Sequence, residues 1–214
     1  MKKGLIITLP QSDDVTEYLA VFSKSITDEC EKRAIKFHEL KREKANKKEF
    51  ETSLKSYDYN FVILNGHGEE NRITGHQNKT IIKKGENNHI LNKRITYARS
   101  CWAAAGLGGC YSRDKTSCFI GYNIPFMFLM DITRATNPIK DKIAEIFFET
   151  SNRLPIGIIK GQTTNQANSN SKKAMLKGIK KALSRGDKDS QAIAEILWNN
   201  YSGQVLLGNK EMTL

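Results

Sequence analysis

Residues 59–68 (YNFVILNGHG) form an apolar run that closes with His67 between two glycines. A second apolar run, residues 94–101 (RITYARSC), closes with Cys101. Short segments that are apolar almost throughout are typical of strands buried on both faces of a parallel sheet. Neighbouring parallel strands end at the same sheet edge, where open α/β sheets bind ligands. The two runs therefore predict an α/β fold that carries an imidazole and a thiol to one crevice.

Upstream of the first run, strand-like and helix-like segments alternate. Residues 4–9 are rich in leucine and β-branched side chains and stop at Pro10, and Asp13 and Asp14 then suit the start of a helix. The predicted order is a strand at 4–9, a helix at 15–33, a strand at 34–40, a helix at 44–56 and a strand at 59–64. This alternation predicts a mostly parallel central sheet flanked by crossover helices.

Downstream, the polar stretch 71–90 predicts a hairpin or an irregular excursion before strand 94–100 returns to the sheet. Further along we expect a helix at 102–109, a strand at 117–129, a helix at 138–153, a short strand at 155–159 and helices at 172–184 and 190–201. The chain is interpreted as one domain over residues 1–214. Its core covers about 1–160, followed by a polar loop at 161–171 and by C-terminal helices and a tail at 172–214.

The composition predicts a soluble cytoplasmic protein with free thiols. No apolar run is long enough to span a membrane, and the apolar part of the N-terminus is too short for a signal peptide. Of the four cysteines, Cys30 and Cys118 lie in apolar patterns and are expected to be buried, whereas Cys110 is ambiguous and could be a loop thiol. A phosphate-binding loop and a His/Cys metal set are both absent from the sequence, so we predict neither a cofactor nor a metal.

The net charge of +11 leaves an acidic protein or nucleic acid open as a partner. Residues 171–185 contain six basic side chains and no acid. Helical spacing predicts that the three aliphatic positions Leu176, Ile179 and Leu183 face the core. The exposed basic stripe would then consist of Lys173, Lys177, Lys180 and Lys181. A merely solvated face is the alternative.

His67 and Cys101 together predict nucleophilic catalysis. A free cysteine has a pKa of about 8.5, so its thiolate form needs stabilisation at neutral pH. We expect Cys101 at the N-terminus of a helix beginning at Trp102, where an anion is favoured, with His67 as the base. The Gly68 N–H and the Cys101 N–H are the predicted oxyanion hole. The other histidines, His38, His76 and His89, are expected to be structural.

These residues resemble the caspase-like cysteine peptidases. The family pattern is an apolar strand ending in His-Gly, here residues 61–68, and a second apolar strand ending in a small residue and Cys, here residues 95–101. The Gln-Ala-Cys-x-Gly signature of caspases is absent, and the interval of 34 residues between His67 and Cys101 is shorter than in caspases. The chain is therefore more similar to CHAT-type and other prokaryotic members. The resemblance implies a three-layer sandwich and an endopeptidase that cleaves a protein substrate and is regulated by a partner, as in bacterial defence or cell-death systems.

The resemblance also implies a specificity pocket. Some branches bind an Arg or Lys side chain of the substrate through a carboxylate beside the cysteine. Asp131, Asp13 and Asp14 follow predicted strands at the relevant edge, and Asp131 is the preferred candidate. Asp13 and Asp14 could instead be helix caps, and Asp131 could simply pair with Arg134. Two other functions stay open: a catalytically inactive caspase-like binding module, and a basic protein that binds an acidic partner or nucleic acid.

Overall fold

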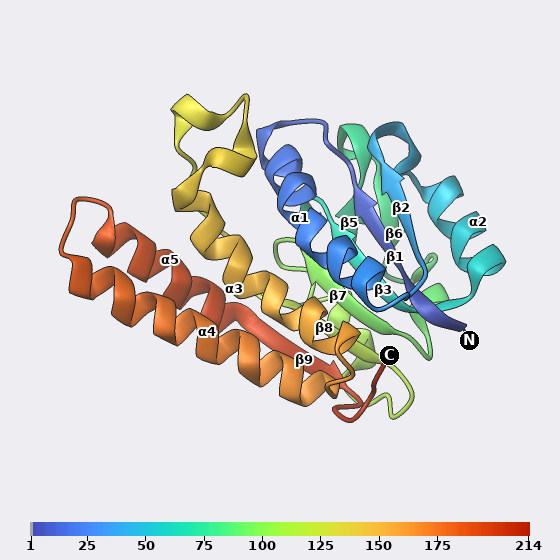
Figure 1. Cartoon of the computed structure of the whole chain (residues 1–214). Helices are drawn as coiled ribbons and strands as arrows, with labels where there is room; N and C mark the ends of the chain where they lie inside the picture. The colour runs from blue at the N-terminus through green and yellow to red at the C-terminus, as the bar shows by residue number, and fades with distance from the viewer. Residues whose placement is uncertain (1) are drawn as a thin grey trace.

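The computed structural model describes residues 2–214, and within them a six-stranded sheet forms the centre of the molecule (Figure 1). In spatial order the strands are β2 (Phe37–Lys41), β1 (Lys2–Leu9), β3 (Tyr59–Asn65), β7 (Ile95–Arg99), β8 (Cys118–Tyr122) and β9 (Gln204–Gly208). The first five are parallel, and β9 pairs antiparallel with β8. The predicted α/β fold with a mostly parallel sheet is confirmed.

Both faces of the sheet are covered. Helices α1 (Asp14–Lys32) and α3 (Lys142–Ile159) pack on one face, over Leu5, Ile7 and their neighbours. The other face, which includes Ile6 and Val62, is covered by α2 (Lys47–Tyr57) and by a small antiparallel sheet. The strands of that small sheet are β4 (Gly68–Glu69), β5 (Arg72–Thr74) and β6 (Thr80–Lys83). The central strands are apolar in nearly every position because they are buried on both sides.

The C-terminal part adds a further layer outside α3. Helices α4 (Thr164–Arg185) and α5 (Ser190–Gly203) pack with α3 around Phe147, Met175 and Leu197 (Figure 1). The polar segment predicted as a loop at 161–171 is helical from Thr164. Thr163 and Gln166 form a capping box there, so a polar composition marks the start of a helix rather than a linker.

Two more predictions about this part of the chain were wrong. The strand expected at 155–159 is the last turn and a half of α3, which accommodates Pro155 inside the helix. The first part of the tail expected at 204–214 forms β9 on the edge of the main sheet. The residues of β9 form backbone hydrogen bonds with β8, and the local sequence pattern does not indicate this pairing.

The basic stripe of α4 is confirmed, but its apolar face differs from the prediction. Lys173, Lys177, Lys180 and Lys181 are all exposed. Leu183 is 59% exposed, whereas the buried positions of α4 include Met175 and Ala182. Ile179 is partly buried against the cluster shared with α3 and α5, and Leu176 is partly buried, so the prediction is wrong for Leu183.

Near the sheet edge, β8 ends at Tyr122 instead of continuing to Leu129 as predicted. Pro125 cannot donate a ladder hydrogen bond, which disfavours a continuing central strand. The side chain of Asn200 on α5 instead binds the backbone of Met127, accepting from its N–H at 3.0 Å and donating to its carbonyl at 2.6 Å. Residues 123–131 are thus an ordered loop between the sheet and α5.

One charged side chain is buried in the centre of the fold. Arg99, the last residue of β7, has an exposure of 0% and lies 5.4 Å from the centroid of the Phe148 ring. Its guanidinium donates to Asn65 Oδ1 on β3 (2.9 Å), to Ser23 Oγ (2.6 Å) and Leu19 O (3.4 Å) on α1, and to Asn152 Oδ1 (2.6 Å) and Ser151 Oγ (3.4 Å) on α3. In the described part of the chain no carboxylate pairs with it. Burial lowers the pKa of Arg99, and the hydrogen bonds that it donates to neutral groups replace its lost hydration.

None of the helices in residues 2–214 is long and apolar enough to cross a membrane.

We predict that Arg99→Ala destabilises the protein by about 3 kcal/mol or more, because it leaves a cavity and several buried polar groups without partners. Urea unfolding followed by circular dichroism measures the change. Arg153→Ala, which alters an exposed arginine, is the matched control and should change the free energy of unfolding by less than about 0.5 kcal/mol. Equal stability of the two variants would show that Arg99 does not hold the core together.

Candidate active site

His67 and Cys101 follow the ends of two adjacent parallel strands at the same offset. In the ladder between β3 and β7, Asn65 lies opposite Arg99, and each candidate residue comes two positions later. The two residues therefore leave the sheet at the same edge, as the sequence predicts.

The backbone after His67 passes directly against the segment that carries Cys101. A Cβ atom added at Gly68 would lie 2.1 Å from Ser100 Oγ and 2.7 Å from Cys101 O. Only glycine fits at such a distance. Gly66 has a similar constraint, since it adopts a φ of +156° and a Cβ there would lie 2.1 Å from Thr74 O. The two glycines that flank His67 thus permit the close approach of the two strand ends.

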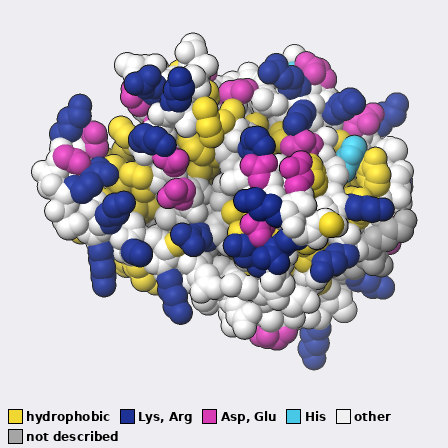
Figure 2. All heavy atoms as spheres, viewed as in Figure 1, with side chains coloured by type: hydrophobic (Ala, Val, Ile, Leu, Met, Phe, Trp, Pro, Cys, Tyr) yellow, Lys and Arg dark blue, Asp and Glu magenta, His cyan; other side chains and the backbone are white. Residues whose placement is uncertain are grey.

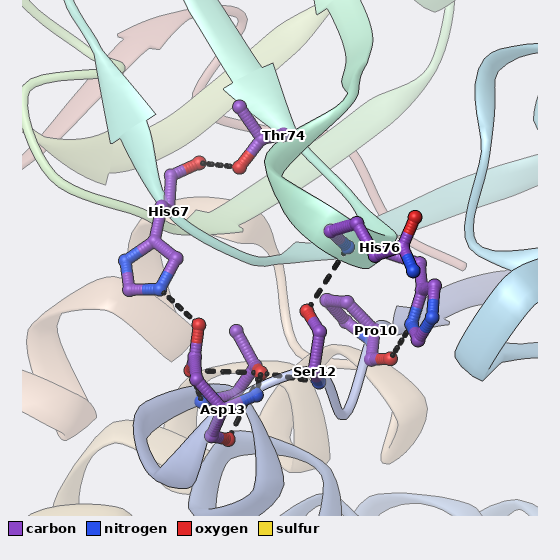
Figure 3. Close-up of polar contacts among 8 residues, drawn as sticks. Pro10, Ser12, Asp13, His67, Thr74 and His76 are labelled. Carbon is purple, nitrogen blue, oxygen red and sulfur yellow. Dashed lines mark hydrogen bonds and ion pairs between the residues drawn. The ribbon is translucent and has the colours of Figure 1, made fainter.

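The imidazole of His67 contacts a carboxylate from the first crossover loop. Its Nε2 lies 2.8 Å from Asp13 Oδ2, and the side chain is 40% exposed (Figure 3). Its backbone carbonyl accepts hydrogen bonds from the N–H and the hydroxyl of Thr74. Among residues 2–214, no hydrogen bond engages Nδ1 of this ring. The histidine is therefore oriented by its Nε2 contact and by its backbone, and the other ring nitrogen is left for chemistry.

Asp13 has two roles at once. It is the N-cap of α1, where Oδ1 accepts from the Thr16 N–H at 2.8 Å, and its second oxygen contacts His67. Burial raises the pKa of the Asp13 carboxyl, but the hydrogen bonds from Thr16 and His67 and the charge of His67 outweigh it and hold the pKa below its ordinary value. The sequence allowed a helix cap or a substrate-binding group at this position. The contact with His67, 54 positions away, is a function that sequence reasoning missed.

The loop that presents Asp13 is itself held by the segment after β5. His76 Nδ1 lies 2.8 Å from Pro10 O (Figure 3). The Gln77 N–H donates to Ser12 Oγ at 3.1 Å. These contacts fix residues 10–12 immediately before the cap. His76 therefore has a structural role, as expected from the sequence. Asp14, the first residue of α1, is exposed beside this loop.

Cys101 is half-buried, and its thiol donates to the Phe126 carbonyl oxygen at 3.8 Å. Burial raises the pKa of this thiol, and hydrogen bonding to the backbone of Phe126 lowers it only in part. The described residues place no hydrogen bond between thiol and imidazole. The resting thiol is therefore neutral, and formation of a thiolate requires a base.

The helix expected at Trp102 does not form. Residues 101–107 are turns, followed by the short 3-10 helix η4 (Gly108–Tyr111). The Trp102 and Ala104 N–H groups bond to the carbonyls of Ile124 and Tyr122 instead, so the chain follows the end of β8. The prediction that a helix N-terminus stabilises the Cys101 thiolate was wrong, because backbone pairing with another segment competes with a glycine-rich helix.

Two further features lie next to the thiol. Trp102 adopts a left-handed φ of +60°, a conformation that costs a residue with a side chain about 1–2 kcal/mol. Ser100 Oγ is buried and has no hydrogen-bond partner among the described residues. Strain and unsatisfied polar groups are common where a structure positions a functional residue.

The carboxylate of Asp131 forms hydrogen bonds within a local turn. Its Oδ1 accepts from the Thr133 N–H at 3.0 Å and from the Thr133 hydroxyl at 2.7 Å, at the start of η5 (Ile132–Arg134). Its Oδ2 lies 4.0 Å from Arg134 Nε, which is the pairing that the sequence left open. The hydrogen bonds from Thr133 lower the pKa of Asp131. Asp131 is thus an ionised group on the loop that follows β8.

A hollow of about 290 Å³ adjoins His67. It is lined by His67, Gly68, Glu69, Arg72, Thr74 and Asn78. Glu69 and Arg72 form an exposed ion pair at its rim. The hollow can take a single side chain or a short backbone segment, and the sequence pattern did not indicate it. Within residues 2–214, no group of three or more potential metal ligands is clustered.

Neither a scan against protein-family models nor a search of curated proteins gave a match for this sequence.

We predict that His67→Ala raises the pKa of Asp13 toward its ordinary value of 3.8, because the variant loses one of the contacts that lower it. A carboxyl group with a lowered pKa stabilises the fold above its unfolded-state pKa and loses that contribution as the pH falls through the native pKa. His67→Ala should therefore lose this contribution at a higher pH than the wild type. Carboxyl-detected NMR titration measures the shift, and His89→Ala is the control. An unchanged Asp13 titration in His67→Ala would contradict the contact.

Proposed function

We propose that this chain is a caspase-like cysteine endopeptidase that uses His67 and Cys101 as a catalytic dyad. The observation that supports it most is the register of β3 and β7, which delivers both residues to one sheet edge with Gly68 against Cys101. The sheet, covered by α1 and α3 on one face and by α2 and the small antiparallel sheet on the other, is compatible with the three-layer sandwich of this superfamily.

In the proposed mechanism, Asp13 selects the tautomer of the base. With Nε2–H donating to the Asp13 carboxylate, Nδ1 carries the lone pair that accepts the Cys101 proton. The thiolate attacks the carbonyl carbon of the scissile peptide bond. The Gly68 and Cys101 N–H groups stabilise the negatively charged oxygen of the tetrahedral intermediate. The imidazolium then protonates the departing amine, and water, activated by His67, hydrolyses the thioester to release the acid and restore the thiol.

The protonation and the hydrogen bonding of the Cys101 thiol are compatible with regulation by a partner. The raised pKa, which burial causes, keeps Cys101 protonated, and the hydrogen bond to the Phe126 carbonyl turns the thiol toward residues 123–131. A partner or substrate that displaces this loop would free the thiol to reach His67. We propose a bacterial defence or cell-death system as the setting, on the resemblance of the two motifs alone.

A basic residue before the scissile bond is the proposed substrate preference. Asp131 lies on the loop that begins at the end of β8 and continues past Phe126, the contact of the thiol. Its carboxylate is ionised and would exchange the Thr133 contacts for a substrate guanidinium or ammonium group. Asp13 contacts His67, and we therefore propose that it orients the catalytic base rather than binding the substrate.

A catalytically silent binding module is the second candidate. It is favoured by one observation: the thiol is bonded to Phe126 and not to the imidazole. Both candidates use the same crevice, and they differ in whether Cys101 can be acylated.

Covalent labelling separates the two candidates. We expect a peptide acyloxymethyl ketone to modify Cys101, and His67→Ala to slow that reaction by about 100-fold or more, since general base catalysis contributes factors of this size. Cys101→Ala should abolish both labelling and peptide cleavage. Cys110→Ala, which removes an exposed thiol, is the matched control and should leave both intact. Intact-mass measurement of the labelled protein gives the readout, and labelling of Cys101 that is independent of His67 would reject the dyad.

For the specificity pocket, we expect a positional-scanning peptide library to give the highest cleavage rates with Arg or Lys before the scissile bond. Asp131→Ala should reduce that preference by about tenfold, as expected for loss of a partly solvated ion pair. Glu31→Ala, which removes an exposed carboxylate that is not a pocket candidate, is the charge-matched control. Cleavage after Asp or apolar residues, unaffected by Asp131→Ala, would refute the assignment of this pocket while leaving the dyad in place.

A further inference from the structure

Most of the excess positive charge of this protein is concentrated in α3 and α4. Residues 142–185 carry nine basic and two acidic side chains, a net charge of +7 out of the +11 of the whole chain. Figure 2 shows Lys and Arg side chains along the part of the surface formed by α4. The fold uses some of these charges in ion pairs, those of Lys142 with Glu145, Lys160 with Glu29 and Arg185 with Asp187. The proposed active site uses none of them.

The two helices enclose a groove between them. Two adjoining hollows, of about 470 and 390 Å³, share Arg153 of α3 and Ala174 and Lys177 of α4. Lys173 extends the basic lining at one end and Lys181 at the other. The hollows therefore form one continuous groove, which we call the α3–α4 groove.

Basic residues outnumber acidic ones in the lining of this groove: the acidic ones are Glu145 and Glu149 of α3, and Lys142 pairs with Glu145. The four basic residues named above, Lys173, Lys177, Lys181 and Arg153, are exposed, and none of them forms an ion pair with another of residues 2–214. Helix α4 contains no acidic residue at all. Like charges one turn apart on a helix repel each other, so this arrangement costs stability in the free protein. An anionic ligand in the groove would remove that cost.

The spacing of the charges fits a linear, regularly charged ligand. Lys173, Lys177 and Lys181 recur every fourth residue, which places them about 6 Å apart along one side of α4. Arg153 faces the same groove from α3. A nucleic-acid strand carries a charge on every nucleotide and binds to such rows mainly through phosphate contacts.

An acidic protein is a poorer match for the groove. Protein interfaces are depleted in lysine and depend on aromatic and other large anchors. The apolar lining of the α3–α4 groove combines small residues, among them Ala174, Gly178 and Ala182, with three isoleucines, and no aromatic side chain lines either hollow. The same lack of aromatic side chains leaves no platform on which bases could stack. Binding would therefore be independent of base sequence.

We propose that the α3–α4 groove binds the phosphate backbone of a nucleic acid, without sequence preference and separately from the Cys101 site.

The test is fluorescence anisotropy with labelled single-stranded RNA, single-stranded DNA and duplex DNA of mixed sequence over a series of salt concentrations. The test variant combines Arg153→Gln, Lys173→Gln, Lys177→Gln and Lys181→Gln. Each lost phosphate contact lowers the slope of log K against log salt by about 0.7 for single strands and 0.9 for duplex DNA, so we expect a total reduction of about 3. Affinity at low salt should fall at least about tenfold.

The matched control removes the same number of charges elsewhere, with Lys48→Gln, Lys55→Gln, Lys84→Gln and Arg113→Gln, all exposed and outside the groove. It should bind with the wild-type salt slope. Equal loss of binding in both variants would overturn the proposal, because it would attribute binding to net charge alone. Displacement of the oligonucleotide by poly-glutamate at equal charge concentration would also overturn it, in favour of an acidic protein. Circular dichroism checks that both variants are folded.

Discussion

The buried guanidinium of Arg99 is the constraint on which the rest of this structure depends. It donates to groups on β3, α1 and α3, and its partners Asn65 and Asn152 donate in turn to α1, to Ser23 Oγ and to Phe22 O respectively. A charge buried without a carboxylate is tolerated only if its donors are satisfied, so the three elements must keep their positions relative to one another. An apolar core alone would allow helices to slide by small amounts at little cost.

The residues of this buried network are only a few positions away in the sequence from the residues of the candidate active site. Arg99 lies two residues before Cys101, and its partner Asn65 lies two residues before His67. Helix α1, which Arg99 binds through Ser23, begins at the cap residue Asp13 that contacts the imidazole. The polar network in the core and the polar contacts at the sheet edge are therefore parts of one assembly, and the site is supported by rigid elements rather than by loops alone.

The thiol is positioned by a different part of the molecule. Cys101 donates to Phe126, and the next residue, Met127, is held through its backbone by Asn200 of α5. The base thus depends on the first half of the chain, while the nucleophile contacts a loop that the C-terminal helices hold in place. A change in the packing of α5 would reach the thiol without disturbing the histidine and its carboxylate.

The sequence by itself determined the alternation of strands and helices, the parallel sheet and the edge at which His67 and Cys101 emerge, because uninterrupted apolar runs and turn residues act locally. It also determined that the lysines of α4 are exposed. Tertiary structure alone decided the contact between Asp13 and His67, the turns after Cys101, the pairing of β9 with β8 and the exposure of Leu183. Each of these depends on which distant segment competes for a backbone hydrogen bond or a packing surface. Local periodicity carries no information about that competition, because it is settled only when the layers pack together.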